Sequence, residues 1–492
     1  MTDHFQKFRE GIIGIDTQLD CPDGKSRPMI YADWVASGRL YGPIEDRLRE
    51  KIMPLVANTH TETSTSGMAM THAYHTAQRR IKEHVNANKR DIIITRSSGM
   101  TGLVNRFQRM LGMKANPDLH LTLREEQCPV VFISHMEHHS NHTSWLETVA
   151  TVEIIPPTEN GLVDVSSLEK LVEKYQDRPI KIASITACSN VTGIPTPYYE
   201  IAQIMHKHGG YCFVDFACSA PYTKIDMHPD LEGADLDAIF FSPHKFLGGP
   251  GSSGVIIFNR DLYHRKVPDT PGGGTVDWTN PWGEHKYIDD IEVREDGGTP
   301  AFLQTIKAAM CITLKEEMGE DRILEREHHL LNILWEIISP LTNLHILAPQ
   351  NRDRLAVVSF YIDDLHFNLG VKLLNDKFGI QTRGGCSCAG TYGHYLLNID
   401  PGRSHQITDL IDRGDYSEKP GWIRVSLHPT MTDQEVTMIG ESIVKLAQNH
   451  QQWREEYDFD PACLELVPKG KNPDEKVKKT ITDAIRNNFT SH

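Results

Sequence analysis

The sequence predicts an α/β protein with a large domain, built on a mainly parallel sheet with helices on both faces, and a smaller α+β domain after it. Two observations support this fold. Between about residues 90 and 305, short apolar runs rich in β-branched residues alternate with amphipathic stretches, which is typical of strands that are buried on both faces. After about residue 305 the pattern changes to two long helical stretches followed by a mixture of strands and helices.

The expected elements follow in chain order. In the large domain we expect strands at 92–94, 130–133, 152–155, 182–185, 212–214, 238–241 and 255–258, and helices at 102–111, 166–174 and 198–208. In the small domain we expect helices at 303–318, 323–338, 369–378 and 434–448, and strands at 356–361 and 423–427. The chain then divides into an N-terminal arm (1–30), a large domain (31–305), a small domain (306–455, with the N-terminal segment contributing) and a charged tail (456–492).

Composition narrows the functional classes. The chain has 492 residues, with 51 Lys and Arg against 66 Asp and Glu, so its net charge is −15. An acidic surface disfavours broad contact with nucleic acid or anionic membranes. No apolar stretch approaches the roughly 18 residues of a membrane helix, and the N-terminus does not resemble a secretory signal. The nine cysteines, an odd number, favour free thiols in a reducing compartment, and we expect a cytoplasmic protein.

Polar motifs follow the ends of five expected strands, where ligands bind in such sheets. The first is FFSPHKFLGGPGSSG (240–254), in which a strand ends in Ser242-Pro243-His244-Lys245. A lysine at this place is suited to form a Schiff base with an aldehyde, and Ser242 and His244 are suited to hold a phosphate. An isolated His-Lys pair would more often be a surface feature, but the position after a buried strand favours the chemical role.

Two further motifs suit a phosphorylated aromatic cofactor. Asp215 directly follows a buried strand, where a carboxylate can pair with a pyridine nitrogen, although a turn or helix cap is an equally common use of such an aspartate. In TRSSGMTGLVN (95–105), small residues lead from a strand into a helix N-terminus, whose N–H groups and dipole suit a phosphate.

A histidine cluster lies in SHMEHHSNHTSW, with His135, His138, His139 and His142 after a strand. One imidazole stacked on a cofactor ring would fit this position. A zinc site is the competing interpretation, but there is no HExxH pattern, and the cluster follows a strand instead of lying within a helix. We therefore expect no metal site, and we expect most of these four histidines to be structural or solvated.

The segment TRGGCSCAG (382–390) places Arg383 before a glycine-bearing loop with Cys386 and Cys388. A guanidinium can hold a substrate carboxylate in a bidentate pair, and a thiol on such a loop can act as a nucleophile. A metal-binding CxC pair or inert thiols are the alternatives. In WIRVS (422–426), Arg424 is either a second carboxylate anchor or a charge at a sheet edge.

These motifs occur in the same order in one family. The sequence resembles the class V aminotransferase group of pyridoxal-phosphate enzymes, and within it the cysteine desulfurases and selenocysteine lyases. The resemblance covers roughly residues 28 to 450 and is carried by YADWVASGR, GMTGLVN, MEHHSN, SNVTG, VDFA, FSPHK, GGTP, RGGCSC and RVSLHPT. It implies the fold-type I architecture of pyridoxal-phosphate transferases, which has a large seven-stranded-type sheet domain and a smaller C-terminal domain.

The resemblance also implies roles for particular residues. Pyridoxal 5'-phosphate would be bound covalently to Lys245, with Asp215 at the pyridine nitrogen and His138 stacked on the ring. Its phosphate would meet four residues of the same chain: Met100, Thr101, Ser242 and His244. Thr299, in GGTP, would reach the phosphate of the neighbouring subunit, so a homodimer with shared active sites is implied.

For the substrate, the resemblance implies a small amino acid, with L-cysteine the expected one. Asn190 would lie near the cofactor hydroxyl and the substrate, while Arg383, assisted by Arg424, would bind the substrate carboxylate. Cys388 would accept the sulfur as a persulfide, leaving alanine, and a sulfur-acceptor protein is a possible partner. The other functions that we weighed are a class V aminotransferase, epimerase or C–S lyase, a non-catalytic partner protein, and a metal enzyme that uses the histidine cluster.

Three departures from the family pattern stand out. Cys218 occupies the position where the family has Gln, three residues after the aspartate, so the partner of the cofactor hydroxyl is open. Cys386 forms an unusual CxC pair with Cys388, so either thiol is a candidate nucleophile. The segment 390–421 separates the cysteine loop from the RVSL strand and is longer than the family predicts, which suggests a lid or a docking element.

Overall fold

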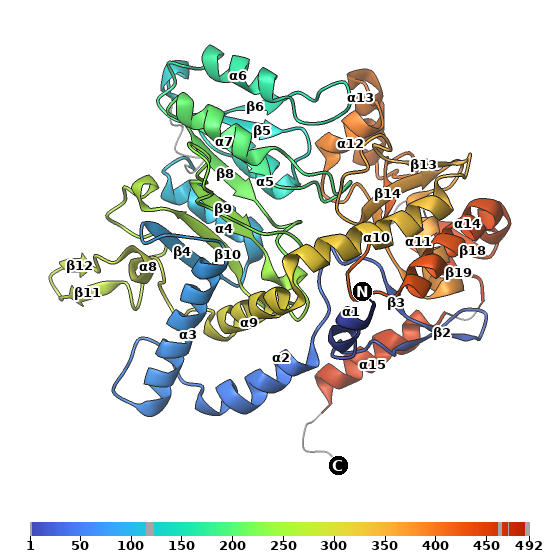
Figure 1. The fold of residues 1–492 in the computed structure, drawn as a ribbon, viewed down its shortest axis with the longest axis horizontal. Coiled ribbons are helices and arrows are strands. Elements are labelled where there is room, and N and C mark those ends of the chain that lie inside the picture. Colours follow the sequence, from blue (N-terminus) through green and yellow to red (C-terminus); the bar gives the residue numbers. More distant parts are fainter. Residues whose placement is uncertain (1, 115–122, 461–464, 471, 488–492) are drawn as a thin grey trace.

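The computed structural model describes residues 2–114, 123–460, 465–470 and 472–487. Its centre is a seven-stranded sheet (Figure 1). The strands lie in the order β4 (Asp91–Arg96), β10 (Gly254–Asn259), β9 (Ala238–Phe241), β8 (Tyr211–Asp215), β7 (Lys181–Thr186), β5 (Val130–Ser134) and β6 (Thr151–Ile155). Strand β10 runs antiparallel to both of its neighbours, and the other pairs are parallel. The seven expected strands and the mainly parallel sheet are confirmed.

Both faces of this sheet are buried, which explains the continuous apolar runs. Along β5, Val131 and Ile133 belong to one apolar cluster and Phe132 to the other, because successive side chains point to opposite faces. Helix α4 (Gly99–Met110) covers the first face, together with α5 (His139–Leu146). Helices α6 (Val165–Lys174) and α7 (Tyr198–Lys207) cover the second face.

Two long helices complete the large domain. Helix α3 (Thr65–His84) buries Met70, Tyr74, Ala77 and Ile81, whose spacing forms one apolar face, and packs against α9 (Phe302–Met318). The hydroxyl of Ser64 caps α3 by accepting a hydrogen bond from the Gly67 N–H at 3.3 Å. Helix α3 precedes residue 90, where the sequence pattern predicted no element.

The small domain is an antiparallel four-stranded sheet. Its strands lie in the order β13 (Leu344–Ile346), β14 (Val357–Ile362), β17 (Trp422–Ser426) and β16 (Arg383–Gly385). Helix α11 (Phe367–Phe378) packs against β16 and β17, and α14 (Asp433–Arg454) packs against both α11 and α10 (Glu320–Ile338). Near the N-terminus, β3 (Ile30–Tyr31) pairs in parallel with β15 (Ile380–Gln381), so the N-terminal segment contributes to this domain.

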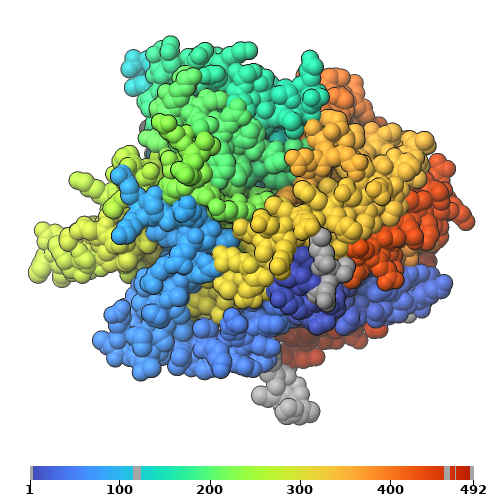
Figure 2. Space-filling view, in the orientation of Figure 1, coloured from blue at the N-terminus to red at the C-terminus, as the bar shows by residue number. Residues whose placement is uncertain are grey.

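The remaining elements lie at the periphery (Figures 1 and 2). They are α1 (Thr2–Arg9), β1 (Gln18–Asp20), β2 (Ser26–Pro28), α2 (Gly42–Arg47), α8 (Ile291–Arg294), the hairpin β11 (Val276–Thr279) and β12 (His285–Tyr287), α12 (Gly390–Leu396), α13 (Pro401–Asp412), β18 (Tyr457–Asp460), β19 (Glu465–Pro468) and α15 (Asp474–Arg486). The segment after the cysteine loop thus folds into α12 and α13. Within the described ranges, every helix is too short or too polar to cross a membrane.

Candidate active site

A cavity of about 230 Å³ lies where the large domain meets the small one. Large-domain residues reach it from the carboxyl ends of β4, β5, β7, β8 and β9, the sheet edge where ligands bind. They are Met100, Thr101, His138, Ser140, Thr186, Asn190, Asp215, Ala217, Cys218, Ser242, His244 and Lys245. The small domain contributes Arg383, Ser387, Cys388 and Arg424, and Val35 and Ala36 complete the lining. The five polar motifs that follow strands therefore meet in one place.

Lys245 carries the amine of the cavity. It lies in a 3-10 turn (Pro243–Lys245) directly after β9. Burial lowers its pKa, partly offset by the thiol of Cys218 and the carboxylate of Asp215. Across the described parts of the chain, no residue forms a hydrogen bond or ion pair with its ammonium group. An amine with a lowered pKa and no partner is available for covalent chemistry with an aldehyde.

Asp215 is the last residue of β8 and is 3% exposed. Burial raises its pKa to about 6, against the opposing effects of the Ala217 N–H and Lys245. Its Oδ1 accepts a hydrogen bond from the Ala217 N–H at 2.8 Å, the one hydrogen bond that the Asp215 side chain makes among the described residues. A cationic N–H partner strongly stabilises the negative charge of such a buried carboxylate, and a protonated pyridine nitrogen is a partner of this kind.

The N-terminus of α4 forms one end of the cavity. The Met100 N–H donates to Ser242 Oγ at 3.0 Å, and the hydroxyls of Thr101 and Ser140 lie 2.6 Å apart. Gly99 has φ of +65°, and a Cβ on Gly254 would lie only 2.5 Å from the Gly99 carbonyl carbon. Glycine is thus needed here for close backbone approach, and the helix dipole with its free N–H groups suits an anion such as a phosphate.

His138 and His244 are the two imidazoles of the cavity. His138 is the N-cap of α5, and its Nδ1 accepts a hydrogen bond from the Ser140 N–H at 3.1 Å, so the ring hydrogen is on Nε2. Burial, reinforced by Lys245, lowers the pKa of each imidazole to about 4. Both rings are therefore neutral at pH 7, which suits stacking and hydrogen bonding better than charge.

The two arginines of the small domain share one carboxylate. Arg424 Nη2 donates to Asp33 Oδ1 at 2.8 Å, and Arg383 Nε donates to Asp33 Oδ2 at 3.0 Å. Arg383 and Arg424 face each other across β16 and β17, and β17 is an inner strand, so a sheet-edge role for Arg424 is wrong. Sequence reasoning missed Asp33, although an acid inside the apolar YADWV run was a usable signal.

The two cysteines of the CxC pair face different cavities. Cys388 is exposed and lines the cavity with Lys245, whereas Cys386 is partly buried and lines a second, mainly apolar cavity of about 180 Å³ beside α12 and α13. Ser387 and Cys388 have φ of +52° and +58°, a region that costs a non-glycine residue roughly 1–2 kcal/mol. Asn190 Nδ2 stabilises this turn by donating to the Ser387 carbonyl at 2.7 Å.

Cys218, which replaces the family's usual Gln, is buried beside a second thiol. Cys218 and Cys188 both donate to the Ser189 carbonyl, at 3.6 and 3.7 Å. The adjacent thiol of Cys188 lowers the pKa of Cys218, whereas burial raises the pKa of Cys188. Cys218 reaches the cavity wall, where a thiol is a much weaker hydrogen-bond partner than a carboxamide.

The other histidines of the cluster point away from this cavity. His139 and His142 contact the start of α12, at Gly390 and Thr391. His135 makes edge contacts with the rings of Tyr392 and Tyr395. Where the structure describes the chain, no group of three or more His, Cys, Asp or Glu side chains is arranged to hold a metal ion.

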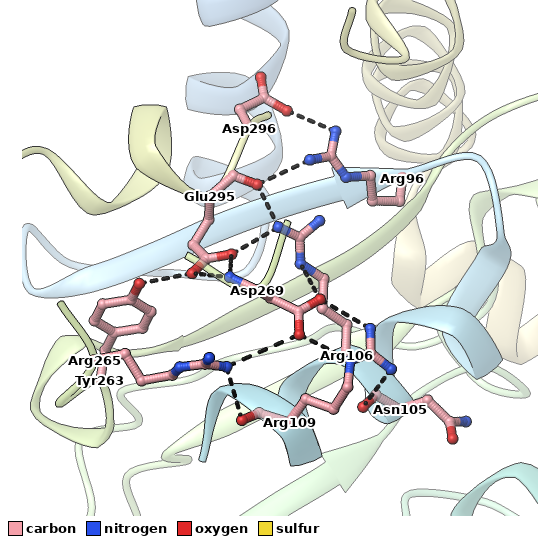
Figure 3. Close-up of polar contacts among 9 residues, drawn as sticks. All are labelled: Arg96, Asn105, Arg106, Arg109, Tyr263, Arg265, Asp269, Glu295 and Asp296. Atoms are coloured by element: carbon pink, nitrogen blue, oxygen red, sulfur yellow. Dashed lines mark hydrogen bonds and ion pairs between the residues drawn. The ribbon is translucent and has the colours of Figure 1, made fainter. Parts of the chain in front are cut away.

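Thr299 is exposed and does not line the cavity of its own chain. The segment that leads to it is held by a buried polar network (Figure 3). Glu295, fully buried, accepts hydrogen bonds from the Tyr263 hydroxyl at 2.6 Å and from Arg106 Nη2 at 2.7 Å. Arg96 Nη2 donates to the Glu295 carbonyl at 2.8 Å. Because Arg106 belongs to α4, the network joins the helix at the cavity to the segment that precedes Thr299.

Comparison with known proteins identifies the family. The family model described as aminotransferase class-V matches residues 30–439, most of the chain. The protein belongs to the class V aminotransferase family. Members of this family are pyridoxal-phosphate enzymes, and the cavity fits that cofactor. It has an unpaired amine for the aldehyde, a buried carboxylate for the pyridine nitrogen and a helix N-terminus for the phosphate.

Among class V aminotransferases, two curated relatives are similar over most of the chain. A probable cysteine desulfurase of Halalkalibacterium halodurans is 30% identical over 371 residues, which are 74% of this chain and 84% of the relative. A probable cysteine desulfurase of Staphylococcus aureus is 28% identical over 366 residues, 73% of this chain and 83% of the relative.

Two solved structures share the class V fold. The cysteine desulfurase of Thermococcus onnurineus, in its apo form, superposes with a TM-score of 0.72 at 22% identity, covering 90% of this chain and 98% of that one. The Escherichia coli cysteine desulfurase CsdA, in an S-sulfonic acid form, superposes with a TM-score of 0.69 at 19% identity and the same coverage. At these identities the superpositions support the fold.

Proposed function

We propose that the protein is a pyridoxal-phosphate-dependent cysteine desulfurase that removes sulfur from L-cysteine, with Cys388 as the sulfur acceptor and alanine as the product. The observation that carries this proposal is the position of Cys388, an exposed thiol in the same cavity as Lys245 and the two arginines. An aminotransferase needs no thiol at this position. The relatives named as probable cysteine desulfurases support the same chemistry.

We assign the cofactor contacts to residues of this chain. Lys245 would hold the aldehyde carbon, Asp215 the pyridine nitrogen and His138 one face of the ring. The phosphate would meet Thr101, Ser242, His244 and the N–H of Met100, and Asn190 would lie at the ring hydroxyl. When bound, pyridoxal phosphate supplies an electron sink that stabilises negative charge on the substrate α-carbon.

Each side chain has a defined task in the proposed reaction. Arg383 binds the substrate carboxylate, and Arg424 supports it through their shared partner Asp33. Lys245, whose pKa is lowered by burial, takes the proton from the α-carbon. Asp215 stays anionic beside a cationic nitrogen.

Cys388 performs the sulfur transfer. Its thiolate attacks the substrate sulfur, so that a sulfur–sulfur bond forms and the substrate carbon–sulfur bond breaks. The electron pair left on carbon takes a proton, and alanine leaves. One thiol and one cysteine become one persulfide and one alanine, so neither an oxidant nor a reductant is consumed.

The decisive experiment adds L-cysteine to the yellow holoenzyme and quantifies alanine and persulfide together. We expect the two in near-equal amounts in the first turnover, with Lys245→Ala inactive and Cys388→Ser unable to form persulfide. Formation of a keto acid, or a change in the cofactor spectrum without alanine, would instead indicate an aminotransferase or epimerase. Full turnover by Lys245→Ala would refute the proposal.

We propose further that the protein works as a homodimer with shared active sites. Thr299 is exposed and away from its own cavity, as a residue acting on a neighbouring site would be. The hairpin β11–β12 projects from the body (Figures 1 and 2) and carries Trp278 and Trp282, which are 49% and 84% exposed. Sedimentation of the holoenzyme tests this. We expect a dimer, and Trp282→Ser should weaken it, whereas a monomer with full activity would contradict shared sites.

We also propose a cytoplasmic location and a protein that accepts the persulfide sulfur. The described cysteines, eight in number, are all free, which supports a reducing compartment. Cys388 is solvent-exposed, and an exposed persulfide is open to a second thiol-bearing protein. Incubation of the persulfide form with a thiol-bearing acceptor, followed by mass measurement of both proteins, tests the transfer.

A further inference from the structure

The cysteine loop and the start of α12 are attached to the large domain through the histidine cluster. His142 Nδ1 lies 3.1 Å from the Thr391 hydroxyl, and the ring of His135 packs edge-on against Tyr392 at 5.4 Å between centroids. The N-terminus of helix α5, which begins at His139, lies between the cavity and the cysteine loop. His138 at its N-cap faces the cavity, and the next residue faces the cysteine loop.

His139 contacts the loop backbone on both sides of Ala389, the residue that follows Cys388. Its backbone N–H donates to the Cys388 carbonyl at 2.7 Å, and its Nε2 accepts a hydrogen bond from the Gly390 N–H at 3.0 Å. Accepting through Nε2 requires a neutral ring with its hydrogen on Nδ1. Burial lowers the pKa of His139, which keeps the ring in this state. One residue thus fixes two consecutive peptide groups that follow the thiol.

The close approach at Gly390 depends on the absence of a side chain. A Cβ at this position would lie 3.3 Å from His139 Nε2, closer than the usual packing of such atoms. The contact therefore depends on both residues: His139 supplies the acceptor Nε2, and Gly390 supplies the N–H without a Cβ that would crowd the ring. A change at either residue disturbs the same hydrogen bond.

The conformation of the loop explains why it needs this support. Ser387 and Cys388 are both in the left-handed region, which non-glycine residues leave unless the surroundings hold them. Ser387 is held by Asn190, through its carbonyl, and by Trp422 Nε1, which donates to its hydroxyl at 3.2 Å. On the other side of the thiol, the hydrogen bonds between the backbone of residues 388–390 and the described part of the large domain come from His139.

We propose that His139 is a positioning residue for the sulfur-transfer step, which holds Cys388 in its left-handed conformation at the cavity through the hydrogen bond from Gly390. The inference rests on the proposed function, because it concerns the thiol that we assign as the sulfur acceptor. His139 touches the loop backbone and is not part of the cavity lining, so its effect on the reaction is indirect. It acts on the placement of the nucleophile and leaves the binding of L-cysteine to the cofactor site unchanged.

The test compares His139→Leu, which removes the acceptor, with His139→Gln, whose side-chain oxygen can replace Nε2. His142→Leu is the matched control, because it removes a hydrogen bond to the same helix one residue farther from the thiol. Two measurements are made on the holoenzyme. One is hydrogen exchange of the peptide that contains Gly390, and the other is the single-turnover rate of persulfide formation from L-cysteine, followed together with the cofactor spectrum.

In His139→Leu we expect exchange at Gly390 to be faster by tenfold or more, and persulfide formation to slow by roughly ten- to a hundredfold, the loss typical of a misplaced reacting group. The spectral change on adding L-cysteine should keep its amplitude and its concentration dependence. His139→Gln should recover most of the rate, and His142→Leu should stay within about threefold of the wild type. If His139→Leu does not fold, Gly390→Ala takes its place, because it disturbs the same hydrogen bond while His139 stays intact. Slow persulfide formation in Gly390→Ala would then support the inference.

Three results would overturn the inference: persulfide formation at the wild-type rate in His139→Leu, equal losses in His139→Leu and His142→Leu, or no recovery in His139→Gln. A wild-type enzyme that forms no alanine would refute the proposed function instead. In that case exchange at Gly390 still decides whether His139 holds the loop, because this measurement does not depend on turnover.

Discussion

Asp33 is the residue whose removal should be most informative, because it is the shared partner of two arginines. In Asp33→Ala, Arg424 loses an ion pair of 2.8 Å in which its side chain is 3% exposed and that of Asp33 is 11% exposed. Two unit charges at this distance attract by about 6 kcal/mol at an effective dielectric constant of about 20. Desolvation offsets part of this attraction, and breaking a buried pair typically costs about 3–5 kcal/mol.

The remaining contacts of Arg424 do not compensate. Its Nη1 still donates to the Asn190 carbonyl at 3.0 Å, but its Nε already lacks a partner. The pair with Arg383 adds less than about 1 kcal/mol, because the side chain of that arginine is 49% exposed. We therefore expect Asp33→Ala to lower the free energy of unfolding by about 3–5 kcal/mol.

The assay is urea unfolding of the holoenzyme followed by tryptophan fluorescence. The matched control is Asp23→Ala, which breaks a pair between Asp23 and Arg27 whose aspartate side chain is 45% exposed, and which should cost less than about 1 kcal/mol. If Asp33→Ala were as stable as Asp23→Ala, the pair would not be an internal support of the small-domain sheet, and the argument from burial would fail.

Three further predictions concern the thiols, the carboxylate anchor and pH. Cys386→Ser should keep sulfur transfer within about twofold of the wild type, because the Cys386 thiol faces the second cavity, whereas Cys388→Ser should lose sulfur transfer. If a persulfide assay showed the loss in Cys386→Ser instead, Cys386 would be the sulfur acceptor. Arg383→Lys should raise KM for L-cysteine about tenfold or more, with a smaller change in kcat, because a lysine cannot form a bidentate pair; an unchanged KM would argue against carboxylate binding. The hydrogen bond to Asp91 raises the pKa of His228 from 6.5 to about 9, so its stabilisation is complete below pH 6.5 and is lost as the pH rises through 9. Unfolding of wild type and His228→Gln should then differ by about 1 kcal/mol at pH 6, a value reduced for partial exposure, and converge at pH 10; a constant difference would contradict this assignment.

Much of the large domain was predictable because its signals are local. Strands buried on both faces need continuous apolar runs, so β5 and β8 are visible in the sequence itself. The cavity residues after those strands were also predictable, because parallel strands end at one edge of the sheet. Lys245 and Asp215 are therefore expected at the same edge of the sheet, and both line the cavity.

The regions that were not predicted have weaker or non-local signals. Helix α3 has mixed polarity, and its apolar face is defined by packing against α9, which lies more than 200 residues away in the sequence. Helices α12 and α13 lie in the segment 390–421, which is longer than the family pattern predicts.

The strands of the large sheet, the polar motifs at their carboxyl ends and the residue types that suit a pyridoxal-phosphate site could all be inferred from the amino-acid sequence, because periodicity and strand-end chemistry act over a few residues. Tertiary structure decided which thiol of the CxC pair faces the amine, since two left-handed residues turn Cys388 toward one cavity and leave Cys386 at another. It also decided that Asp33 joins Arg383 and Arg424, and that His139 supports the cysteine loop. These contacts link residues about 250 to 390 positions apart, and only the packing of the two domains brings their side chains within hydrogen-bonding distance.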